Sequence, residues 1–192
     1  MQQLKYLTFE KLAQTKYSNP EPGVLAIDVT ASASAIIVPF SKIQHVKKVS
    51  FEWYSVGKID FPKGINEKSK KGDDALLRIG LIISGEKPRF SFLAPAWLKT
   101  LATHIKFSSD RMLYLTVQDP NRFHSEKWVS PYHDSITAAA VLCRKTAILN
   151  SKWQACSFEL STITETVALW IMADGDNTGA SFKSFLRNLI LE

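Results

Sequence analysis

The sequence predicts an all-β protein, an antiparallel β-sandwich of jelly-roll type with one short helix. Short apolar segments separated by turn residues recur along the chain, and strands do not alternate with helices as they do around a parallel sheet. A length of 192 residues is typical of one domain, so we expect residues 1–192 to form a single β-sandwich domain. A content of 45% hydrophobic and 22% charged residues excludes a disordered or collagen-like chain.

Ten strands are expected. In chain order they are Leu4–Phe9, Val24–Thr30, Ala35–Phe40, Val46–Val56, Ala75–Ser84, Met112–Val117, Ile136–Lys145, Trp153–Leu160, Thr166–Met172 and Phe185–Leu191. In the fourth strand Val49, Phe51 and Trp53 alternate with polar residues, which places these three on one face. The fifth strand is apolar on both faces apart from Arg78 and Gly80, which indicates a central strand covered on both sides.

The segment 94–105 predicts the helix, because Pro95 suits a first turn and the apolar residues that follow form one stripe. The long, polar, lysine-rich segment 57–73 predicts either a flexible flap or the rim of a binding site. The two cysteines fit no zinc-binding spacing. A hairpin between the strands 136–145 and 153–160 would place Cys143 opposite Cys156, and we expect these cysteines to be close together, reduced and buried.

Charge and hydropathy exclude two classes of partner. Lys and Arg outnumber Asp and Glu by 24 to 18, but they are spread along the chain rather than gathered on one face or tail, so no nucleic-acid partner is expected. No apolar run approaches the about 18 residues that span a bilayer, so no transmembrane segment is expected. The first residues lack the apolar core of a signal peptide, which leaves a cytoplasmic protein or one whose leader has been removed.

The string from Asp174 to Gly179 is the first candidate site. Oxygen-bearing side chains at alternate positions are typical of a calcium-binding loop, so Asp174 and Asp176 are candidate calcium ligands. The string is no EF-hand, because Phe185 occupies the position of the required carboxylate. A tight turn is the alternative, since Asp-Gly and Asn-x-Gly are ordinary turn sequences.

Asp73, Asp74 and Arg78 form the second candidate site. Adjacent carboxylates on an extended strand point to opposite faces, whereas Asp74 and Arg78 are expected to share a face. An arginine inside an apolar strand must be paired or line a polar cavity, because burying it alone is very unfavourable. We therefore expect Arg78 to lie within hydrogen-bonding reach of at least one of Asp73, Asp74, Asp174 and Asp176, either as a structural ion pair or as part of a ligand site.

Two strings, KKGDDALLRIGL and IMADGDNTGASF, resemble the bacterial domain of unknown function family 3047, and the resemblance covers nearly the whole chain. The resemblance implies that a polar set is shared with the family: Trp53, Asp73, Asp74, Arg78, Tyr132, Asp174, Asp176 and Asn177. Members of that family commonly carry export signals, which implies a periplasmic or extracellular location with the leader removed. The strand layout is also similar to galactose-binding-like jelly rolls, which implies carbohydrate binding by analogy.

Three functions follow as hypotheses. The first is a non-enzymatic binding module for a polar small molecule or an envelope or extracellular glycan, because the chain has no metalloprotease, nucleophile-elbow, Walker or Rossmann motif. The second is an enzyme acting on polysaccharide through the carboxylates of both candidate sites, with Arg78 as an anion clamp. The third is a structural or assembly protein of the envelope. A pocket joining the Arg78 strand to the Asp174 loop would favour the enzyme, and a groove lined with Trp or Tyr would favour the glycan binder.

Overall fold

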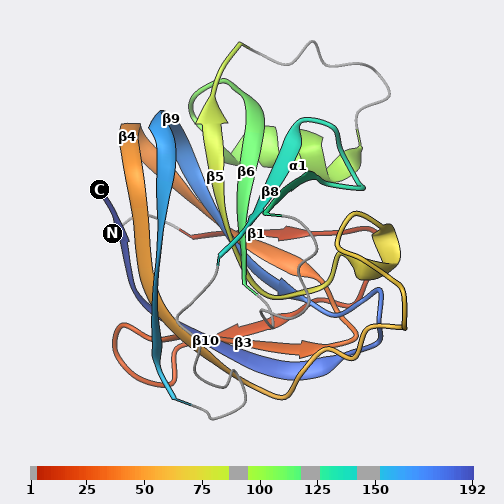
Figure 1. The fold of residues 1–192 in the computed structure, drawn as a ribbon. Helices are drawn as coiled ribbons and strands as arrows, with labels where there is room; N and C mark the ends of the chain where they lie inside the picture. The colour runs from red at the N-terminus through yellow and green to blue at the C-terminus, as the bar shows by residue number, and fades with distance from the viewer. Residues whose placement is uncertain (1–3, 87–94, 118–125, 142–151) are drawn as a thin grey trace.

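A computed structural model describes residues 4–86, 95–117, 126–141 and 152–192, and it is mostly β-sheet with one short helix, as predicted (Figure 1). The strands are β1 (Lys5–Thr8), β2 (Lys16–Ser18), β3 (Leu25–Thr30), β4 (Ser34–Val56), β5 (Ala75–Ser84), β6 (Ser109–Val117), β7 (Lys127–Val129), β8 (Ile136–Ala140), β9 (Gln154–Asp174) and β10 (Ser181–Leu191). A 3₁₀ turn, η1 (Lys70–Gly72), precedes β5, and the helix α1 (Ala96–His104) lies between β5 and β6 in the chain. No helix in the described ranges is long and apolar enough to cross a membrane.

The ten strands form one sheet in the order β2-β3-β10-β4-β9-β5-β6-β8-β7, with β1 paired to β4. The long strands β4 and β9 connect two layers (Figure 1). The first part of β4 pairs with β1 and the end of β9, and the second part pairs with β10 and the start of β9. The β4–β9 register shifts between Pro39 and Gln44, where proline lacks a ladder donor. The sequence predicts separate strands at 35–40 and 46–56, whereas the structure joins them in the bent strand β4. The predicted strands at 153–160 and 166–172 are likewise joined in β9.

The strand pairs are antiparallel except for β6 and β8, which run parallel. The predicted hairpin between 136–145 and 153–160 is wrong in its described part. Ala139 lies opposite Leu115 and Lys127, and Phe158 lies opposite Val49, because β9 occupies the place between β4 and β5. The sandwich-like all-β class is confirmed, and assignment to the jelly-roll type stays a prediction.

The cysteine prediction is also corrected. Cys156 is disulfide-bonded, so the expectation that it is reduced is wrong. Its burial, with an exposed fraction of 5%, agrees with the prediction. Cys143, the other cysteine of the chain, lies outside the described residues, so its expected position opposite Cys156 stays a prediction.

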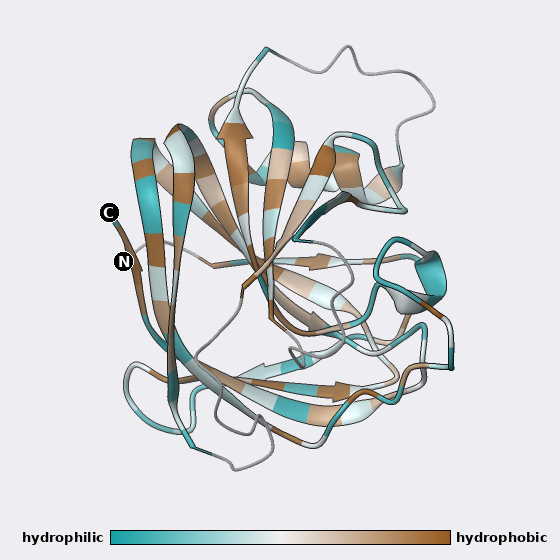
Figure 2. Ribbon diagram, viewed as in Figure 1, coloured by the Kyte–Doolittle hydropathy of each residue, from teal (hydrophilic) through white to brown (hydrophobic). Residues whose placement is uncertain are grey.

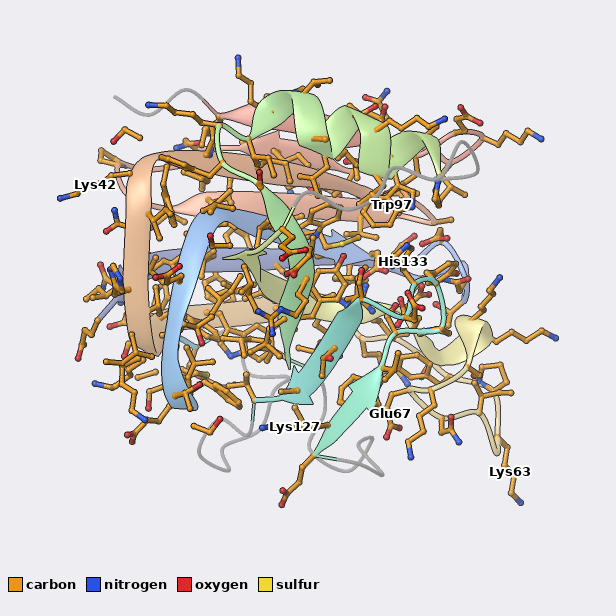
Figure 3. All side chains as sticks on the ribbon, turned by 90° about the horizontal axis from the view of Figure 1, so that it is seen from above. Lys42, Lys63, Glu67, Trp97, Lys127 and His133 are labelled. Atoms are coloured by element: carbon orange, nitrogen blue, oxygen red, sulfur yellow. The ribbon has the colours of Figure 1, made fainter. Side chains whose placement is uncertain are left out.

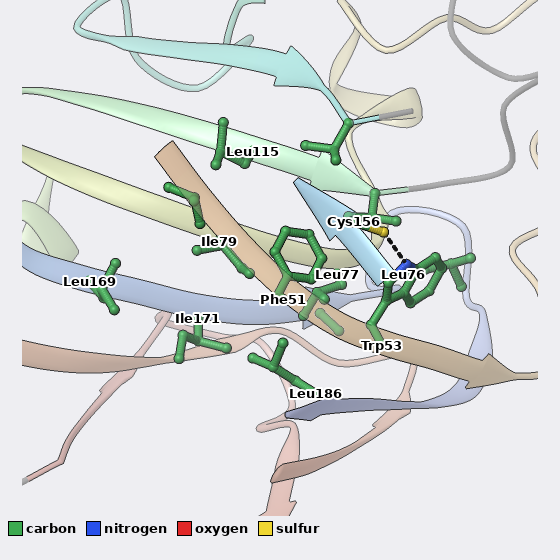
Figure 4. Packing of buried hydrophobic residues seen from close by; sticks show 14 of the residues in the cluster. Phe51, Trp53, Leu76, Leu77, Ile79, Leu115, Cys156, Leu169, Ile171 and Leu186 are labelled. Carbon is green, nitrogen blue, oxygen red and sulfur yellow. Dashed lines mark hydrogen bonds between the residues drawn. The ribbon is translucent and has the colours of Figure 1, made fainter. Parts of the chain in front are cut away.

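Two hydrophobic cores form on the two faces of the sheet. The first lies between the layers and contains Val49, Phe51 and Trp53, which confirms that these residues share a face (Figure 4). Apolar and polar residues accordingly alternate along β4 (Figure 2). The second core lies on the opposite face and includes Leu101 of the helix α1. Figure 3 shows α1 lying along the sheet. Residues 75–82 of β5 are all buried, so the prediction of a strand covered on both sides is confirmed.

Candidate functional site

Arg78 lies at the centre of the candidate site. Its Nη1 donates to Oδ2 of Asp174 at 2.8 Å, and its Nη2 lies 3.2 Å from Oδ2 of Asp73. The side chains of Arg78 and Asp174 are each 4% exposed. Asp174 is fixed further because its Oδ1 accepts a hydrogen bond from the backbone N–H of Ala75 at 3.0 Å. The expected proximity of Arg78 to the aspartates is therefore confirmed.

The predicted shared face of Asp74 and Arg78 is wrong. The pairing of β5 with β9 is irregular between Ala75 and Arg78, and both Leu76 and Leu77 consequently belong to the core between the layers. This irregularity interrupts the simple alternation of side chains along the strand. Arg78 forms ion pairs with Asp73 and Asp174.

Asp74 holds the loop that follows β9. Its Oδ1 accepts hydrogen bonds from the backbone N–H of Asn177 at 3.1 Å and from Nδ2 of the same residue at 2.9 Å. Its Oδ2 accepts from the backbone N–H of Thr178 at 2.8 Å and from its Oγ1 at 2.6 Å. The loop is a turn, closed by the N–H of Ala180 on the carbonyl of Gly175 at 3.0 Å, with Gly179 at a φ of +71°. The two sequence motifs therefore meet through Asp74 as well as through Arg78.

A cavity of about 190 Å³ opens beside these groups. One part of its wall is aromatic: the ring of Trp170 lies 5.9–6.1 Å, centroid to centroid, from the rings of Phe9, Trp97 and Tyr114. The other part is polar. The lining residues are Phe9, Leu12, Ala33, Asp73, Arg78, Trp97, Tyr114, Ser130, Tyr132, Ile136, Trp170, Met172, Asp174, Asp176 and Asn177.

Gly80 makes room for the aromatic wall. It lies on β5 between Trp170 of β9 and Tyr114 of β6 in the sheet register. A Cβ atom at this position would lie 2.8 Å from Cβ of Trp170 and 3.1 Å from the ring of Tyr114. Only glycine therefore allows both rings to pack against the strand at these positions.

A second hollow of about 220 Å³ adjoins the first, since Trp97 and Ile136 line both. Polar groups in its lining include Asp110, Arg111 and His133. The rings of His133 and Trp97 are 6.3 Å apart and nearly perpendicular (Figure 3). Trp97 of α1 thus separates two adjoining spaces.

Burial, and after it the neighbouring carboxylates, shift the pKa values of the carboxyl groups of the site. Burial, together with the nearby Asp74 and Asp176, raises the pKa of Asp73 to about 6, although Arg78 opposes this rise. Burial and then Asp74 raise the pKa of Asp176 as well. Burial alone would lower the pKa of Arg78, but Asp174 and Asp73 raise it above its ordinary value, so this guanidinium stays charged.

Two polar side chains that line the cavity have no partner on another residue in the described part of the chain. The indole Nε1 of Trp170 is buried and has no acceptor within the described ranges. Apart from the backbone N–H of Asp176 itself, no group of the described residues donates a hydrogen bond to the Asp176 carboxylate. The Asp176 carboxylate is partly exposed and lines the cavity, so it is the acceptor of the two that a ligand would reach.

Three carboxylates could in principle hold a metal ion, because ligand oxygens of Asp74, Asp174 and Asp176 lie within 4.8 Å of one another. Calcium takes six to eight oxygen ligands. Each oxygen of Asp74 already accepts two hydrogen bonds, and each oxygen of Asp174 accepts one. Calcium binding by Asp174 and Asp176 stays a prediction.

The structure brings together seven of the eight residues singled out in the sequence. They are Asp73, Asp74, Arg78, Tyr132, Asp174, Asp176 and Asn177, and Tyr132 joins them because its hydroxyl donates to Oδ1 of Asn177 at 2.8 Å. Trp53 is not among them. It is fully buried in the core between the layers, where its Nε1 lies 3.2 Å from Sγ of Cys156 (Figure 4). Its assignment to the ligand site is therefore wrong.

The aromatic wall was missed from the sequence. Trp97 fits the apolar stripe of the helix, and Trp170 lies within an apolar strand, so both patterns indicate core residues equally well. The signal that could have found them is Gly80, which interrupts an otherwise apolar strand and indicates a close approach by other groups. No family model, curated protein or solved structure matches the chain in comparisons with known proteins.

Proposed function

We propose that this protein is a binding module that takes one sugar unit of an envelope or extracellular glycan into the cavity. One observation carries the proposal: aromatic rings and hydrogen-bonding side chains line the same small cavity. A sugar ring presents an apolar face of C–H groups and a rim of hydroxyls. Aromatic rings complement the apolar face, and carboxylates and amides accept from the hydroxyls. Phe9 and Trp97 are partly exposed and line the cavity together with these polar groups.

The size of the cavity agrees with a small ligand. The cavity volume of about 190 Å³ lies below the ~300–1,000 Å³ that is usual for pockets that bind drug-sized ligands. That space suits a single six-membered ring with its hydroxyls rather than a buried chain. The adjoining hollow of about 220 Å³ could take the next unit of an oligosaccharide across Trp97.

We further propose that the chain belongs to the bacterial domain of unknown function family 3047 and acts in the periplasm or outside the cell. The strings KKGDDALLRIGL and IMADGDNTGASF are the most specific parts of the resemblance. They contact each other through the Arg78–Asp174 ion pair and the Asn177–Asp74 hydrogen bond, which supports membership. The disulfide bond at Cys156 supports the location, because disulfides form and persist in oxidising compartments. Free thiols in protein isolated from its natural compartment would contradict this location.

A second candidate function is an enzyme that acts on polysaccharide. The cavity joins the Arg78 strand to the loop after Asp174, and Asp73 in its wall has a pKa of about 6, which suits a general acid near neutral pH. We place this function second because most carboxylate oxygens of the cluster are engaged by protein donors, which leaves Asp176 and one oxygen of Asp73 for a substrate.

The test is a glycan array followed by isothermal titration of the glycans that bind, using wild-type protein and two tryptophan variants. Trp97→Ala removes part of the cavity wall and is expected to weaken binding at least about tenfold. Trp153→Ala is the matched control, because Trp153 is also half-buried but packs against Tyr54 and Arg187 outside the cavity. Equal losses in the two variants, or no glycan bound, would overturn the proposal.

The wild-type protein and the further variant Asp73→Asn decide between binding and catalysis. Incubation of each bound glycan with wild-type protein should leave it intact if the protein only binds. Release of shorter products that stops in Asp73→Asn, with binding retained, would establish the enzyme instead.

A further inference from the structure

We propose that the glycan bound by this protein is acidic: an uncharged sugar unit occupies the cavity, and carboxylate or sulfate groups on the adjoining units bind a lysine rim beside it. The lysine rim consists of Lys63, Lys68, Lys70 and Lys71, all in the loop between β4 and β5. The inference rests on the proposed function and adds the charge of the ligand. Three observations carry it: the surface charge of this loop, its compact turns and its position against the cavity.

The loop between β4 and β5 separates its charges between the surface and the interior. Of its acidic residues, Asp60 pairs with Lys58 at 2.6 Å, and Glu67 is only 1% exposed. Asp73 is 9% exposed and pairs with Arg78. The lysines of the rim, in contrast, are all exposed and form no ion pair with a carboxylate of the described residues. The surface of this loop therefore carries an excess of four positive charges, which attracts anions.

Backbone turns fold the lysine rim back on itself. The N–H groups of Ile65, Ser69 and Gly72 each donate to the carbonyl three residues earlier, at 3.2, 3.2 and 2.9 Å. The last of these turns is η1, which carries Lys70 and Lys71, and Lys63 points away from the body of the molecule (Figure 3). Cations held in one folded loop repel one another, so an anion that binds among them relieves this repulsion.

The lysine rim borders the cavity. Nζ of Lys70 lies 5.4 Å from the centroid of the Tyr132 ring. Tyr132 lines the cavity and donates to Asn177, which lines it as well. Two residues after Lys71 the chain reaches Asp73, a further residue of the cavity wall. A glycan that leaves the cavity on this side therefore passes the lysine rim.

The cavity and the lysine rim have opposite charge, and this difference assigns the units of the glycan. The cavity wall contains the carboxylates of Asp73, Asp174 and Asp176, and its cation Arg78 is already paired with the first two. These carboxylates would repel an anionic sugar, so the unit in the cavity is uncharged and the anionic groups lie on the units outside. A nucleic acid carries a phosphate on every unit and cannot meet this pattern. A glycan with uncharged units between charged ones can.

The experiment compares three polymers with the same glucose backbone: dextran, lightly carboxymethylated dextran and lightly sulfated dextran. Light substitution leaves uncharged glucose units between the charged ones. By biolayer interferometry at low salt, we expect the charged polymers to bind the wild-type protein at least about tenfold more tightly than dextran, because several weak surface ion pairs act together. The advantage should shrink in about 0.15 M salt, which screens exposed charges. The charged polymer that binds more tightly identifies the anionic group.

Two variants with the same net charge locate the effect. The rim variant Lys63→Gln/Lys68→Gln/Lys70→Gln/Lys71→Gln should reduce the ratio of charged to neutral affinity to near one. The matched control is Lys16→Gln/Lys42→Gln/Lys106→Gln/Lys127→Gln, in which four exposed lysines outside the loop are replaced. The control should keep the ratio of the wild-type protein. Both variants should keep the wild-type melting temperature, because the replaced side chains are exposed.

The outcomes separate this inference from the proposed function. If charge gives no advantage, or if the rim and control variants lose it equally, the inference is overturned, and glycan binding through Trp97 is unaffected. If single-stranded DNA binds as tightly as the charged dextrans, the lysine rim is a general polyanion site and the inference is overturned. If the rim variant loses the advantage but Trp97→Ala changes no affinity, the cavity takes no part, so the proposed function fails and the lysine rim stands.

Discussion

The guanidinium of Arg78 and the carboxylate of Asp174 form a 2.8 Å ion pair between neighbouring strands, although 96 residues separate them in the chain. Both side chains are almost wholly removed from solvent. A buried charge is tolerated only when it is paired and hydrogen-bonded. Arg78 therefore serves the fold as well as the cavity, because it compensates two buried carboxylates.

Replacement of Arg78 is expected to destabilise the protein strongly. Arg78→Met keeps the length of the side chain but leaves Asp73 and Asp174 unpaired, at an expected cost of about 3–5 kcal/mol in the free energy of unfolding. Urea denaturation at pH 7 measures this loss. The double variant Arg78→Met/Asp174→Asn should recover part of it, because one uncompensated charge is then removed. A loss below about 1 kcal/mol, as for a solvent-exposed ion pair, would contradict the structure.

Asp73 is expected to make stability depend on pH. Its pKa rises on folding from 3.8 to about 6, so the folded chain binds this proton more tightly than the unfolded chain. The resulting stabilisation is fully present below about pH 4 and is lost as the pH rises through about 6. At ~1.4 kcal/mol for each pH unit, the change is about 3 kcal/mol. Asp73→Asn should flatten the urea-denaturation stability profile between pH 4 and pH 7, and an unchanged profile would disprove the shift.

The hydroxyl of Thr178 is expected to stabilise the loop after β9, because it donates to Asp74 at 2.6 Å. Thr178→Val keeps the shape of the side chain but removes this donor to a charged acceptor. We expect a loss of about 1.5–3 kcal/mol in thermal or urea unfolding. Thr162→Val, at an exposed position of β9, is the matched control and should change stability by less than about 0.5 kcal/mol. Equal effects of the two substitutions would show that the Asp74 contact contributes nothing.

Gly80→Ala tests the packing of the aromatic wall. The added methyl group would lie 2.8 Å from Cβ of Trp170, so the strand or the ring must move. Overpacking of this kind typically costs about 1–3 kcal/mol. We expect weaker sugar binding together with a lower melting temperature, measured beside Ser84→Ala on the same strand. Wild-type stability and affinity in Gly80→Ala would show that the wall is not tightly packed there.

Calcium is expected to leave the melting temperature unchanged. A ligand that binds only the folded state raises the melting temperature in proportion to its affinity. Protein donors already engage the oxygens of Asp74 and Asp174, which leaves too few free ligands for a calcium ion. Differential scanning calorimetry with millimolar calcium and with a chelator measures this directly. A rise of several degrees that the chelator reverses would assign the loop to calcium instead.

The sequence predicted the fold class and the strands well because alternation and turn residues are local signals. Val49 and Phe51 face the core as their spacing predicts, and β5 begins and ends at the predicted residues. Local signals could not show that β4 and β9 continue through their bends, since that depends on which strands pair with each half. For the same reason, local signals could not show that β8 pairs in parallel with β6.

The part of the candidate site around Arg78 could be predicted, because a charged residue is unusual within an apolar strand. Arg78 within an apolar strand required carboxylate partners, and the structure supplies Asp73 and Asp174. Which aspartates pair with it depends on the irregular register after Ala75, which no sequence pattern indicates. For Trp53 and Trp97 the sequence pattern did not distinguish a core residue from a site residue. Both have apolar patterns, and only packing in three dimensions separates a core residue from a cavity wall.

The long sequence separation of the site residues has a consequence for folding kinetics. The cavity needs Phe9 near the start of the chain, Arg78 in the middle and Asn177 near the end. Sheets built from such distant pairs fold slowly, in about milliseconds to seconds, because large loops must close before the contacts form. No early hairpin can contain a working site. Recovery of sugar binding during refolding should therefore follow the recovery of strand structure, and it would report the completion of the native state.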